Sequence, residues 1–525
     1  MKNDGVIYQT ITNIEDGEYW WGGSTDDGKS QPFDKTTVFI KNLFTDAPNQ
    51  TMPFYASSHG RYIFSHKPFE IEFNNGKITT KGSCVIVSKC GDSLKSAYAG
   101  AAAEYFPFRG NSLPEDFFLH PQYNTWMQFT YNPTQEGVLE YAENVIKHGF
   151  TPGVFIIDEG WHGRYGLWEF DKLKFPDPKG MIDKLHKMGF KVMLWVVPYY
   201  TPDGKGFVDD NSEYTRKIRG ITYNCKHFLR NAAGDYAVCH WWNGYSFALD
   251  LTDENDFKLL DGKLHKLMND YGVDGFKFDG GDIGGYLATN FINGPMPPHY
   301  SPVEQNRAWN DFGLRYKYHE YKDTFNGAGK ICIQRLRDRA HEWYELKELI
   351  GCGALAGLIG EPFICPDMIG GGSWVYKDYL KDKFDPELFV RMAQASALFP
   401  MMQFSWAPWD VLTDEEVCYC KSAADLHVSF GKYITDLVKN SCVTGKPILR
   451  LMEYEFPHCG YEKINDQFML GSSVLVAPVL DKGVGERKVI IPEGEWLLHG
   501  KGQPYVKGEY NVAAPLSDLI WFMKK

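Results

Sequence analysis

The first part of the chain alternates short apolar runs with turn residues. Runs rich in β-branched and aromatic residues are TTVFIKNL, RYIFSH, FEIEFNNGKITTKG and CVIVSK, and Gly, Asn and Asp separate them. The NNGK segment is a strong hairpin signal, because Asn and Gly readily adopt positive φ. We therefore predict an N-terminal β-sandwich over residues 1–117.

From about residue 118, segments with apolar residues at helical spacing alternate with short strand-like runs. The segment PTQEGVLEYAENVIKHGF has its apolar residues at helical spacing, and we expect Asn132 to cap this helix and Pro133 to lie in its first turn. Apolar runs, most of them followed by Gly or acid, alternate with such helices, namely GVFIIDEGW, KVMLWVVPYY, FALDLTD, DGFKFDGGD, KICIQRLRDR and EPFICPDMIGGG. This alternation predicts parallel strands joined by crossover helices.

The number of these units favours a closed barrel over an open sheet. The strand count approaches eight, so we predict a (β/α)8 TIM barrel over residues 118–445. An open nucleotide-binding sheet would carry a Gly-rich turn after its first strand. GGDIGG comes late in the chain and GAGK lacks the first half of a phosphate loop, so we interpret both as ordinary loops.

The end of the chain returns to β-type patterning. The runs DQFMLGSSVLVAPVL, GERKVIIP, EWLLHG and DLIWFMKK predict a C-terminal β-sandwich over residues 446–525. The expected fold class is thus α/β, with one β-sandwich before the barrel and one after it in the sequence.

Composition narrows the range of partners. The chain has 525 residues, 43% of them hydrophobic and 15% aromatic, with a formal net charge of −12 and no long basic run. This balance argues against nucleic acid and against membranes as partners. The 11 Cys form no zinc or disulfide framework, and the N-terminus lacks the apolar core of a signal peptide. We expect a cytoplasmic protein, although a trimmed secreted or periplasmic one would look the same, and a homo-oligomer stays open.

Acidic residues follow most of the predicted strands. They are Asp158, Glu159, Asp250, Asp279, Asp282, Asp338 and Asp367. Each one alone is as typical of a turn or a helix cap as of a functional site. However, the carboxyl ends of barrel strands meet at one rim, and like charges collected there repel each other. The set therefore indicates a pocket that handles cations or developing positive charge.

Two chemistries fit such a pocket. A metal site is disfavoured, because His is missing from these strand ends apart from His341 and no phosphate loop accompanies the acids. Glycoside hydrolysis needs two carboxyl groups around an oxocarbenium-like transition state. Tryptophans near the strand ends would suit sugar binding, or would pack the barrel mouth: Trp126, Trp161, Trp195, Trp406 and Trp409.

These motifs resemble glycoside hydrolase family 31. DGFKFDGGD resembles the family's nucleophile strand, which implies that Asp279 is the nucleophile. RLRDRAHEWYEL resembles its acid/base segment, which implies that Asp338 is the acid/base, with Trp343 five residues later. GEPFICPDMIGGG implies that Asp367 binds sugar hydroxyls, and PMMQFSWAPW resembles the segment that ends at Trp409. The C-terminal DQFMLGSSVLVAPVL…VIIPEGEW resembles the family's proximal β-domain.

The departures from the common pattern indicate a branch of the family. KFDGGD stands where many α-glucosidases have DMNE, and LRDR replaces the usual GDN. FKFD and PDMIGG look closest to the α-galactosidase-like branch of the myogenesis-regulating glycosidase. Lys277 then either donates to the sugar's hydroxyls or pairs with a neighbouring Asp at the rim.

The resemblance implies a retaining, exo-acting α-galactosidase that works without a cofactor or metal. Its substrate would be an oligosaccharide or glycoside, and the two carboxyl groups would stand roughly 5–5.5 Å apart. We expect the sugar to contact seven further side chains, those of Asp158, Glu159, Trp195, Lys277, Arg335, Asp367 and Trp409. Arg337 and Arg339 should point elsewhere. An α-glucosidase or other α-glycosidase of the family is the alternative, followed by a non-catalytic sugar-binding protein.

Overall fold

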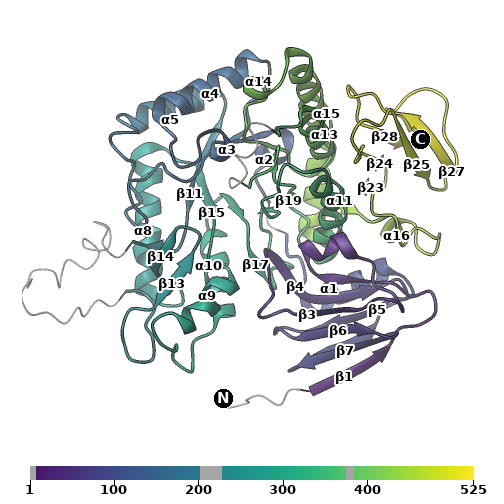
Figure 1. Ribbon diagram of the computed structural model, residues 1–525, viewed down its shortest axis with the longest axis horizontal. Helices are drawn as coiled ribbons and strands as arrows, with labels where there is room; N and C mark the ends of the chain where they lie inside the picture. The colour runs from purple at the N-terminus through teal and green to yellow at the C-terminus, as the bar shows by residue number, and fades with distance from the viewer. Residues whose placement is uncertain (1–7, 111, 202–226, 374–382) are drawn as a thin grey trace, which may run out of the picture. The chain divides into compact units, whose positions relative to one another are not determined.

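The computed structural model describes residues 8–110, 112–201, 227–373 and 383–525 (Figure 1). The chain divides into two compact units. The first unit comprises Met1–Gln122, His148–Thr151 and Asn326–Lys525, and the second comprises Tyr123–Lys147 and Pro152–Phe325. Each unit is described by itself below. The residues 1–7, which enter the expectation about localisation, lie outside the described part.

The N-terminal part of the first unit consists of two antiparallel sheets. One has the order β1-β7-β6-β3, with β1 at Tyr8–Asn13, β3 at Phe39–Asn42, β6 at Glu70–Asn74 and β7 at Lys77–Gly82. The other contains β2 at Trp20–Ser24, β4 at Gln50–Ser57, β5 at Arg61–Phe64 and β8 at Ile86–Lys89. A buried core that includes Trp20, Tyr55, Ile71 and Phe73 joins them. The predicted hairpin is present, since Asn75 and Gly76 both have positive φ between β6 and β7.

The second unit carries five parallel strands in the order β9-β10-β11-β15-β16. Their bounds are Gln122–Asn124, Val154–Ile157, Lys191–Val196, Gly275–Phe278 and Tyr318–Tyr321. β10, β11 and β15 are buried along their whole length apart from Lys191, as strands covered on both faces are. The α-helices of this unit within the described ranges are α3 at Trp126–Phe129, α4 at Gln135–Lys147, α5 at Pro178–Lys187, α8 at Glu254–Tyr271, α9 at Ile283–Ala288 and α10 at Pro302–Gly313.

The start of one predicted helix is wrong. We expected Asn132 to cap the helix that the structure begins at Gln135. Instead the Thr134 hydroxyl accepts the bond from Gly137 N at 3.1 Å, and Thr134 O accepts from Val138 N. The helix therefore starts later than expected, because the hydroxyl of Thr134, one residue before the helix, accepts from a free backbone N–H group of its first turn.

One predicted barrel strand is also wrong. Part of FALDLTD belongs to β14, Gly244–Ala248, which forms a small antiparallel sheet with β12, Tyr199–Tyr200, and β13, Val238–Trp241. The barrel strand that comes after β15 is β16, which the sequence pattern missed. Its four residues YHEY are polar and aromatic, so no apolar run marks them, although all four are buried.

The remaining barrel elements lie in the first unit. β18, Gln334–Arg335, pairs in parallel with β19, Ile364–Cys365, and β20, Met368–Ile369, pairs in parallel with β21, Gln403–Phe404. Helices of this part that the structure describes include α11 at Trp343–Leu358, α13 at Pro386–Ala397, α14 at Pro408–Val411 and α15 at Asp414–Thr444. α1 at Leu94–Tyr105 and α2 at Asp116–Leu119 precede them in the chain. The 310-helix η1, Thr25–Ser30, packs against α11.

The C-terminal part of the first unit is β-rich as well. One sheet has the order β22-β23-β24-β28-β26, with strands at Leu449–Arg450, Phe468–Leu470, Val474–Val476, Trp521–Lys524 and Trp496–Leu498. β25, Glu486–Ile491, pairs with β27, Gly508–Ala513, and the short helix α16 spans Met452–Glu455. Their shared core includes Met469, Leu475, Ile491, Trp496 and Phe522.

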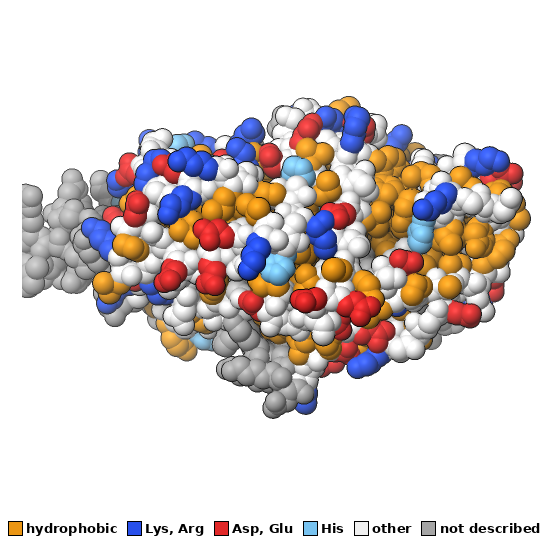
Figure 2. All heavy atoms as spheres, turned by 90° about the horizontal axis from the view of Figure 1, so that it is seen from above, with side chains coloured by type: hydrophobic (Ala, Val, Ile, Leu, Met, Phe, Trp, Pro, Cys, Tyr) orange, Lys and Arg blue, Asp and Glu red, His pale blue; other side chains and the backbone are white. Residues whose placement is uncertain are grey.

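The surface carries charges of both signs. On the face in Figure 2, Lys and Arg side chains lie singly among Asp and Glu side chains. Of the helices in the described ranges, none is long and apolar enough to cross a membrane.

Candidate active site

The side chain of Asp279 is held at the end of β15. Trp195 Nε1 donates to Oδ2 at 2.9 Å, and Gly280 N donates to Oδ1 at 2.9 Å. Its own backbone N–H donates to Val196 O at 2.9 Å. The residue is 7% exposed. Both carboxylate oxygens therefore have a fixed direction, which is what a nucleophile needs in order to meet its target atom.

The chain turns sharply directly after Asp279. Gly280 and Gly281 have φ of +61° and +71°, and a Cβ on Gly281 would stand 2.5 Å from the Trp309 ring. Asp282 then caps α9 by accepting from Gly285 N at 2.6 Å. Asp282 is thus a helix cap, as one of our two interpretations of strand-end acids had it.

Asp250 also has a structural role. Its carboxylate accepts from Thr252 N at 3.1 Å and from Gln305 Nε2 at 2.8 Å. These bonds close a turn before α8 and tie it to α10. Asp250 therefore belongs to a turn, and its place after β14 sets it apart from the barrel strands.

Lys277 forms a buried ion pair. Its Nζ lies 2.6 Å from Asp158 Oδ2, and the two side chains are 4% and 3% exposed. The same oxygen accepts from Asn124 Nδ2 at 2.8 Å, and Asp158 Oδ1 accepts from Glu159 N at 2.9 Å. Of the two interpretations of Lys277, the structure shows the charge pair.

We expect Lys277→Met to destabilise the protein by about 3–5 kcal/mol, because Asp158 would keep a buried charge without its cation. Urea unfolding measures this difference. The double variant Lys277→Met, Asp158→Asn removes both charges and should recover most of the loss. A single variant as stable as the wild type would contradict the role of the pair.

Glu159 follows Asp158 and sits in a different environment. Its carboxylate accepts from the Tyr165 hydroxyl and from Asn243 Nδ2. Burial raises the pKa of Glu159 to about 8, and the negative charges of Asp158 and Asp279 add to this, while the hydrogen bond from Tyr165 and the nearby Trp242 side chain oppose it. Glu159 therefore carries a proton at neutral pH, beside a candidate nucleophile that must stay ionised.

This proton gives a testable pH dependence of stability. Because the pKa of Glu159 is raised on folding from 4.5 to about 8, the folded state binds the extra proton between these values. Stability should fall as the pH rises through this range, by up to about 1.4 kcal/mol per pH unit. Glu159→Gln mimics the protonated acid, so its unfolding free energy should lack this slope. Equal slopes for both proteins in denaturant titrations from pH 5 to 9 would contradict the shift.

The two tryptophans that we expected at the sugar have other contacts. Trp195 is 1% exposed, and its indole N–H donates a hydrogen bond to Asp279. Trp409 in α14 stacks on His148, with ring centroids 4.8 Å apart and an interplanar angle of 3°, and its ring also lies against Phe150. Trp195 thus positions a carboxylate, and one face of Trp409 is covered by protein.

The first unit supplies a second group of charged side chains. Arg335 at the end of β18 is 1% exposed, and its Nη1 lies 2.7 Å from Asp338 Oδ1 and 2.5 Å from Asp367 Oδ1. The Asp338 side chain is 31% exposed, whereas that of Asp367 is 1% exposed. One guanidinium thus holds two carboxyl groups, of which Asp338 remains accessible.

Asp367 has an unusual backbone. Its φ is +108°, a conformation that non-glycine residues rarely adopt. Its Oδ2 accepts from Arg339 N at 2.8 Å and from Gly372 N at 3.1 Å, and these bonds hold the turn. Gly372 is needed for space, because a Cβ there would stand 2.8 Å from Asp367 Oδ1 and 3.0 Å from Asp338 Oδ1. Burial raises the pKa of Asp367, and Arg335 opposes that shift.

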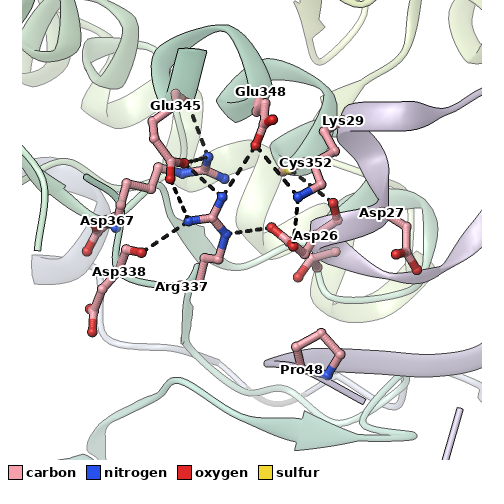
Figure 3. A network of polar contacts seen from close by, with 12 residues as sticks. Asp26, Asp27, Lys29, Pro48, Arg337, Asp338, Glu345, Glu348, Cys352 and Asp367 are labelled. Atoms are coloured by element: carbon pink, nitrogen blue, oxygen red, sulfur yellow. Dashed lines mark hydrogen bonds and ion pairs between the residues drawn. The ribbon is translucent and has the colours of Figure 1, made fainter. Parts of the chain in front are cut away.

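Arg337 anchors the loop that carries Asp338 (Figure 3). Its Nη1 donates to Asp338 O at 3.2 Å and to Glu345 of α11 at 2.9 Å. Its Nε donates to Asp26 of η1 at 2.5 Å, and Nη2 reaches Glu348 at 3.3 Å. Arg339 donates to Glu345 at 3.0 Å. Arg337 therefore binds α11 and η1 and Arg339 binds α11, which leaves Arg335 as the cation at the two Asp side chains.

The structure brings the predicted residues together in two groups. The second unit joins Asp158, Glu159, Trp195, Lys277 and Asp279, and the first joins Arg335, Asp338 and Asp367. Sequence reasoning missed Tyr165, Asn243 and Asp26. Asn243 precedes Gly244 in a turn, a pattern that could have revealed a hairpin. In the ranges that the structure describes, we find no group of His, Cys, Asp and Glu that could hold a metal ion.

The family model for the glycosyl hydrolase family 31 TIM barrel matches residues 118–411. The model for the family's C-terminal domain matches residues 445–525. The chain belongs to glycoside hydrolase family 31. The barrel and the C-terminal β-domain that the sequence predicts are thus confirmed, and antiparallel β-sheets precede them. Asp279 and Asp338 lie within the barrel match.

Relatives in family 31 have several activities in their names. The myogenesis-regulating glycosidase of Mus musculus is 30% identical over 79% of this chain and 57% of its own length. The alpha-xylosidase XylQ of Lactiplantibacillus pentosus is 24% identical over 89% of this chain and 63% of its own length. The chain thus spans less than two thirds of these relatives.

Solved structures of family 31 share the fold. The family 31 dextranase of Flavobacterium johnsoniae, complexed with glucose, has a TM-score of 0.85 at 21% identity and covers all of this chain and 67% of its own. A sulfoquinovosidase from E. rectale, complexed with an aza-sugar inhibitor, has a TM-score of 0.81 at 17% identity over 98% of this chain and 82% of its own. At these identities the likeness concerns the fold alone.

Proposed function

We propose that the chain is a retaining, exo-acting α-glycosidase and that its substrate is a terminal α-linked galactose. The observation that carries the proposal is Asp279, a carboxylate fixed by two donors at the end of a barrel strand. Membership of family 31 and the match of Asp338 to the acid/base motif support it. No cofactor takes part in the proposed reaction.

The proposed reaction has two steps. In the first, an Asp279 oxygen forms a bond to the anomeric carbon while the bond to the leaving oxygen breaks, and that oxygen takes the proton of Asp338. In the second, Asp338 removes a proton from water, whose oxygen attacks the anomeric carbon and releases Asp279. Two inversions at one carbon give net retention. Trp195 and Gly280 stabilise the carboxylate that is restored at the end.

Galactose is supported by two motifs. FKFD and PDMIGG resemble the α-galactosidase-like branch of the myogenesis-regulating glycosidase, and the relative of that name is 30% identical to this chain. α-Glucosidase activity is the second candidate, because an enzyme named alpha-glucosidase 2 of Bacillus thermoamyloliquefaciens is 24% identical over 95% of this chain.

A panel of para-nitrophenyl α-glycosides tests the proposal. We expect the galactoside to be cleaved with a higher kcat/KM than the glucoside and the xyloside, and NMR of the first product should show the α-anomer. Preference for the glucoside would support the second candidate. Binding of sugars without cleavage of any substrate would support a non-catalytic sugar-binding protein instead. Asp279→Ala protein, purified in the same way, controls for contaminating glycosidases.

A further inference from the structure

A tryptophan occupies the tip of the hairpin between β13 and β14. Trp241 pairs with Gly244, so Trp242 and Asn243 form a two-residue turn. Such turns favour Asn and Gly, and Asn243 fits that preference, whereas Trp242 does not. The Trp242 side chain is 45% exposed although it is large and apolar. The turn itself gives no reason for a tryptophan at this position.

Polar contacts fix the turn beside Glu159. Asn243 Nδ2 donates to the Glu159 carboxylate and to the Tyr165 hydroxyl at 2.9 Å. Asn243 Oδ1 accepts from the Tyr131 hydroxyl at 2.9 Å. The Trp242 side chain also lies near enough to Glu159 to lower the pKa of its carboxyl. The hairpin tip is therefore attached to the residue that follows β10.

An aromatic base supports the exposed ring. Trp242 packs edge-on against Trp241, with centroids 5.0 Å apart. Trp241 is 6% exposed and contacts the Tyr165 and Tyr199 rings, each at 4.8 Å between centroids. Its Nε1 donates to Ser246 Oγ at 3.0 Å. Because Trp242 rests on a buried and bonded ring, little freedom is lost when a ligand contacts it.

The ring lies beside residues that follow two strands of the barrel sheet. Glu159, to which Asn243 is bonded, follows β10, and the negative charge of Asp279 raises its pKa. Lys322 Nζ lies 5.9 Å from the centroid of the Trp242 ring, and Lys322 follows β16. β11 and β15 lie between these strands in the sheet. Trp242 is thus near the carboxyl ends of the strands on both sides of Asp279, where substrates of barrel enzymes bind.

We propose that Trp242 is the stacking platform for the leaving-group sugar, the residue next to the bond that is cleaved. This inference rests on the proposed glycosidase function. The sugar that is released has to place its anomeric carbon against Asp279. An indole ring at the edge of this site therefore contacts the leaving-group sugar, on the other side of the cleaved bond. The C–H face of a pyranose packs well on an indole ring, and the Lys322 ammonium would offer a donor to its hydroxyls.

The test compares substrates with and without a leaving-group sugar. Trp242→Ala should lower kcat/KM for α-galactosyl or α-glucosyl disaccharides about 10- to 100-fold, mainly through KM. It should leave the hydrolysis of the corresponding glycosyl fluoride within about 2-fold, since fluoride makes no stacking contact. Trp242→Phe should retain most of the activity on disaccharides. Tyr245→Ala, which removes a 63% exposed ring from the same hairpin, is the matched control and should change neither substrate.

If Trp242→Ala lowered kcat/KM equally for the disaccharide and the glycosyl fluoride, the role of Trp242 as a stacking platform would be overturned. It would also be overturned if the variant lost no activity on either substrate. Binding gives a readout that does not need turnover. In the Asp279→Ala background, Trp242→Ala should weaken disaccharide binding at least 10-fold in calorimetry and leave binding of the free monosaccharide unchanged. If the wild type cleaves no glycosyl fluoride, the proposed function fails, and this binding comparison still decides for or against the platform.

Discussion

Asp279→Ala should abolish turnover of every substrate that the wild type cleaves, with a loss in kcat of about 10⁴-fold or more. Without Asp279 no glycosyl-enzyme ester forms, for activated and for ordinary leaving groups alike. Steady-state assays with nitrophenyl glycosides measure the loss. A small anion such as azide or formate should enter the vacated position and restore part of the rate. The sugar product would then have the opposite anomeric configuration to the substrate.

Asp282→Asn is the matched control, because Asp282 lies three residues further along the same loop and caps α9. Asn is an equally good cap, so the stability should change by less than about 1 kcal/mol. The kcat should stay within about 2-fold. Activity of Asp279→Ala above a tenth of the wild-type value would contradict the assignment of the nucleophile.

Asp338→Ala should lower kcat/KM about 10²- to 10⁴-fold for disaccharides, whose leaving oxygen needs a proton. Its effect on glycosyl fluorides should be much smaller, because fluoride leaves without protonation. The side chain is accessible enough to serve as this donor, with 31% of its surface exposed beside buried Arg335. Rates measured from pH 4 to 9 should also lose the basic limb of the profile in the variant.

Asp367 supplies a comparison for this variant, because Arg335 contacts both carboxyl groups. Asp367→Asn should slow the hydrolysis of disaccharides and fluorides to a similar extent, since Asp367 holds the turn and the guanidinium and transfers no proton. A similar loss on both substrates in Asp338→Ala would contradict its role as the acid.

Local signals in the sequence predicted much of the fold. The Asn-Gly pair after β6 required positive φ at both turn positions, and the structure has it. Asp177 and Asp385, each followed by Pro, cap α5 and α13 through side-chain bonds to Gly180 N and Leu388 N. These features were predictable because a few neighbouring residues decide them. The strand-end positions of Asp279 and Asp338 followed from the alternation of strands and helices.

Other features depend on residues far apart in the chain. β16 is buried through tertiary packing, and its polar sequence YHEY carries no apolar signal. Trp195 uses its indole N–H for a carboxylate 84 positions later. Lys277 and Asp158 are separated by 119 positions, so only the folded chain decides between an ion pair and a free cation. No local pattern in the sequence contains these pairings.

The bond between Asp26 and Arg337 spans 311 positions, and it has a consequence for the order of events on the ribosome. The nucleophile and its donors lie within residues 123–325, an almost continuous stretch that emerges early and contacts itself. The loop of Asp338 becomes anchored only when the helix from residue 343 to 358 has joined an N-terminal segment made long before. We expect the contacts of Asp279 to form before those of Asp338 in a nascent chain, which should lack glycosidase activity until both segments have been made.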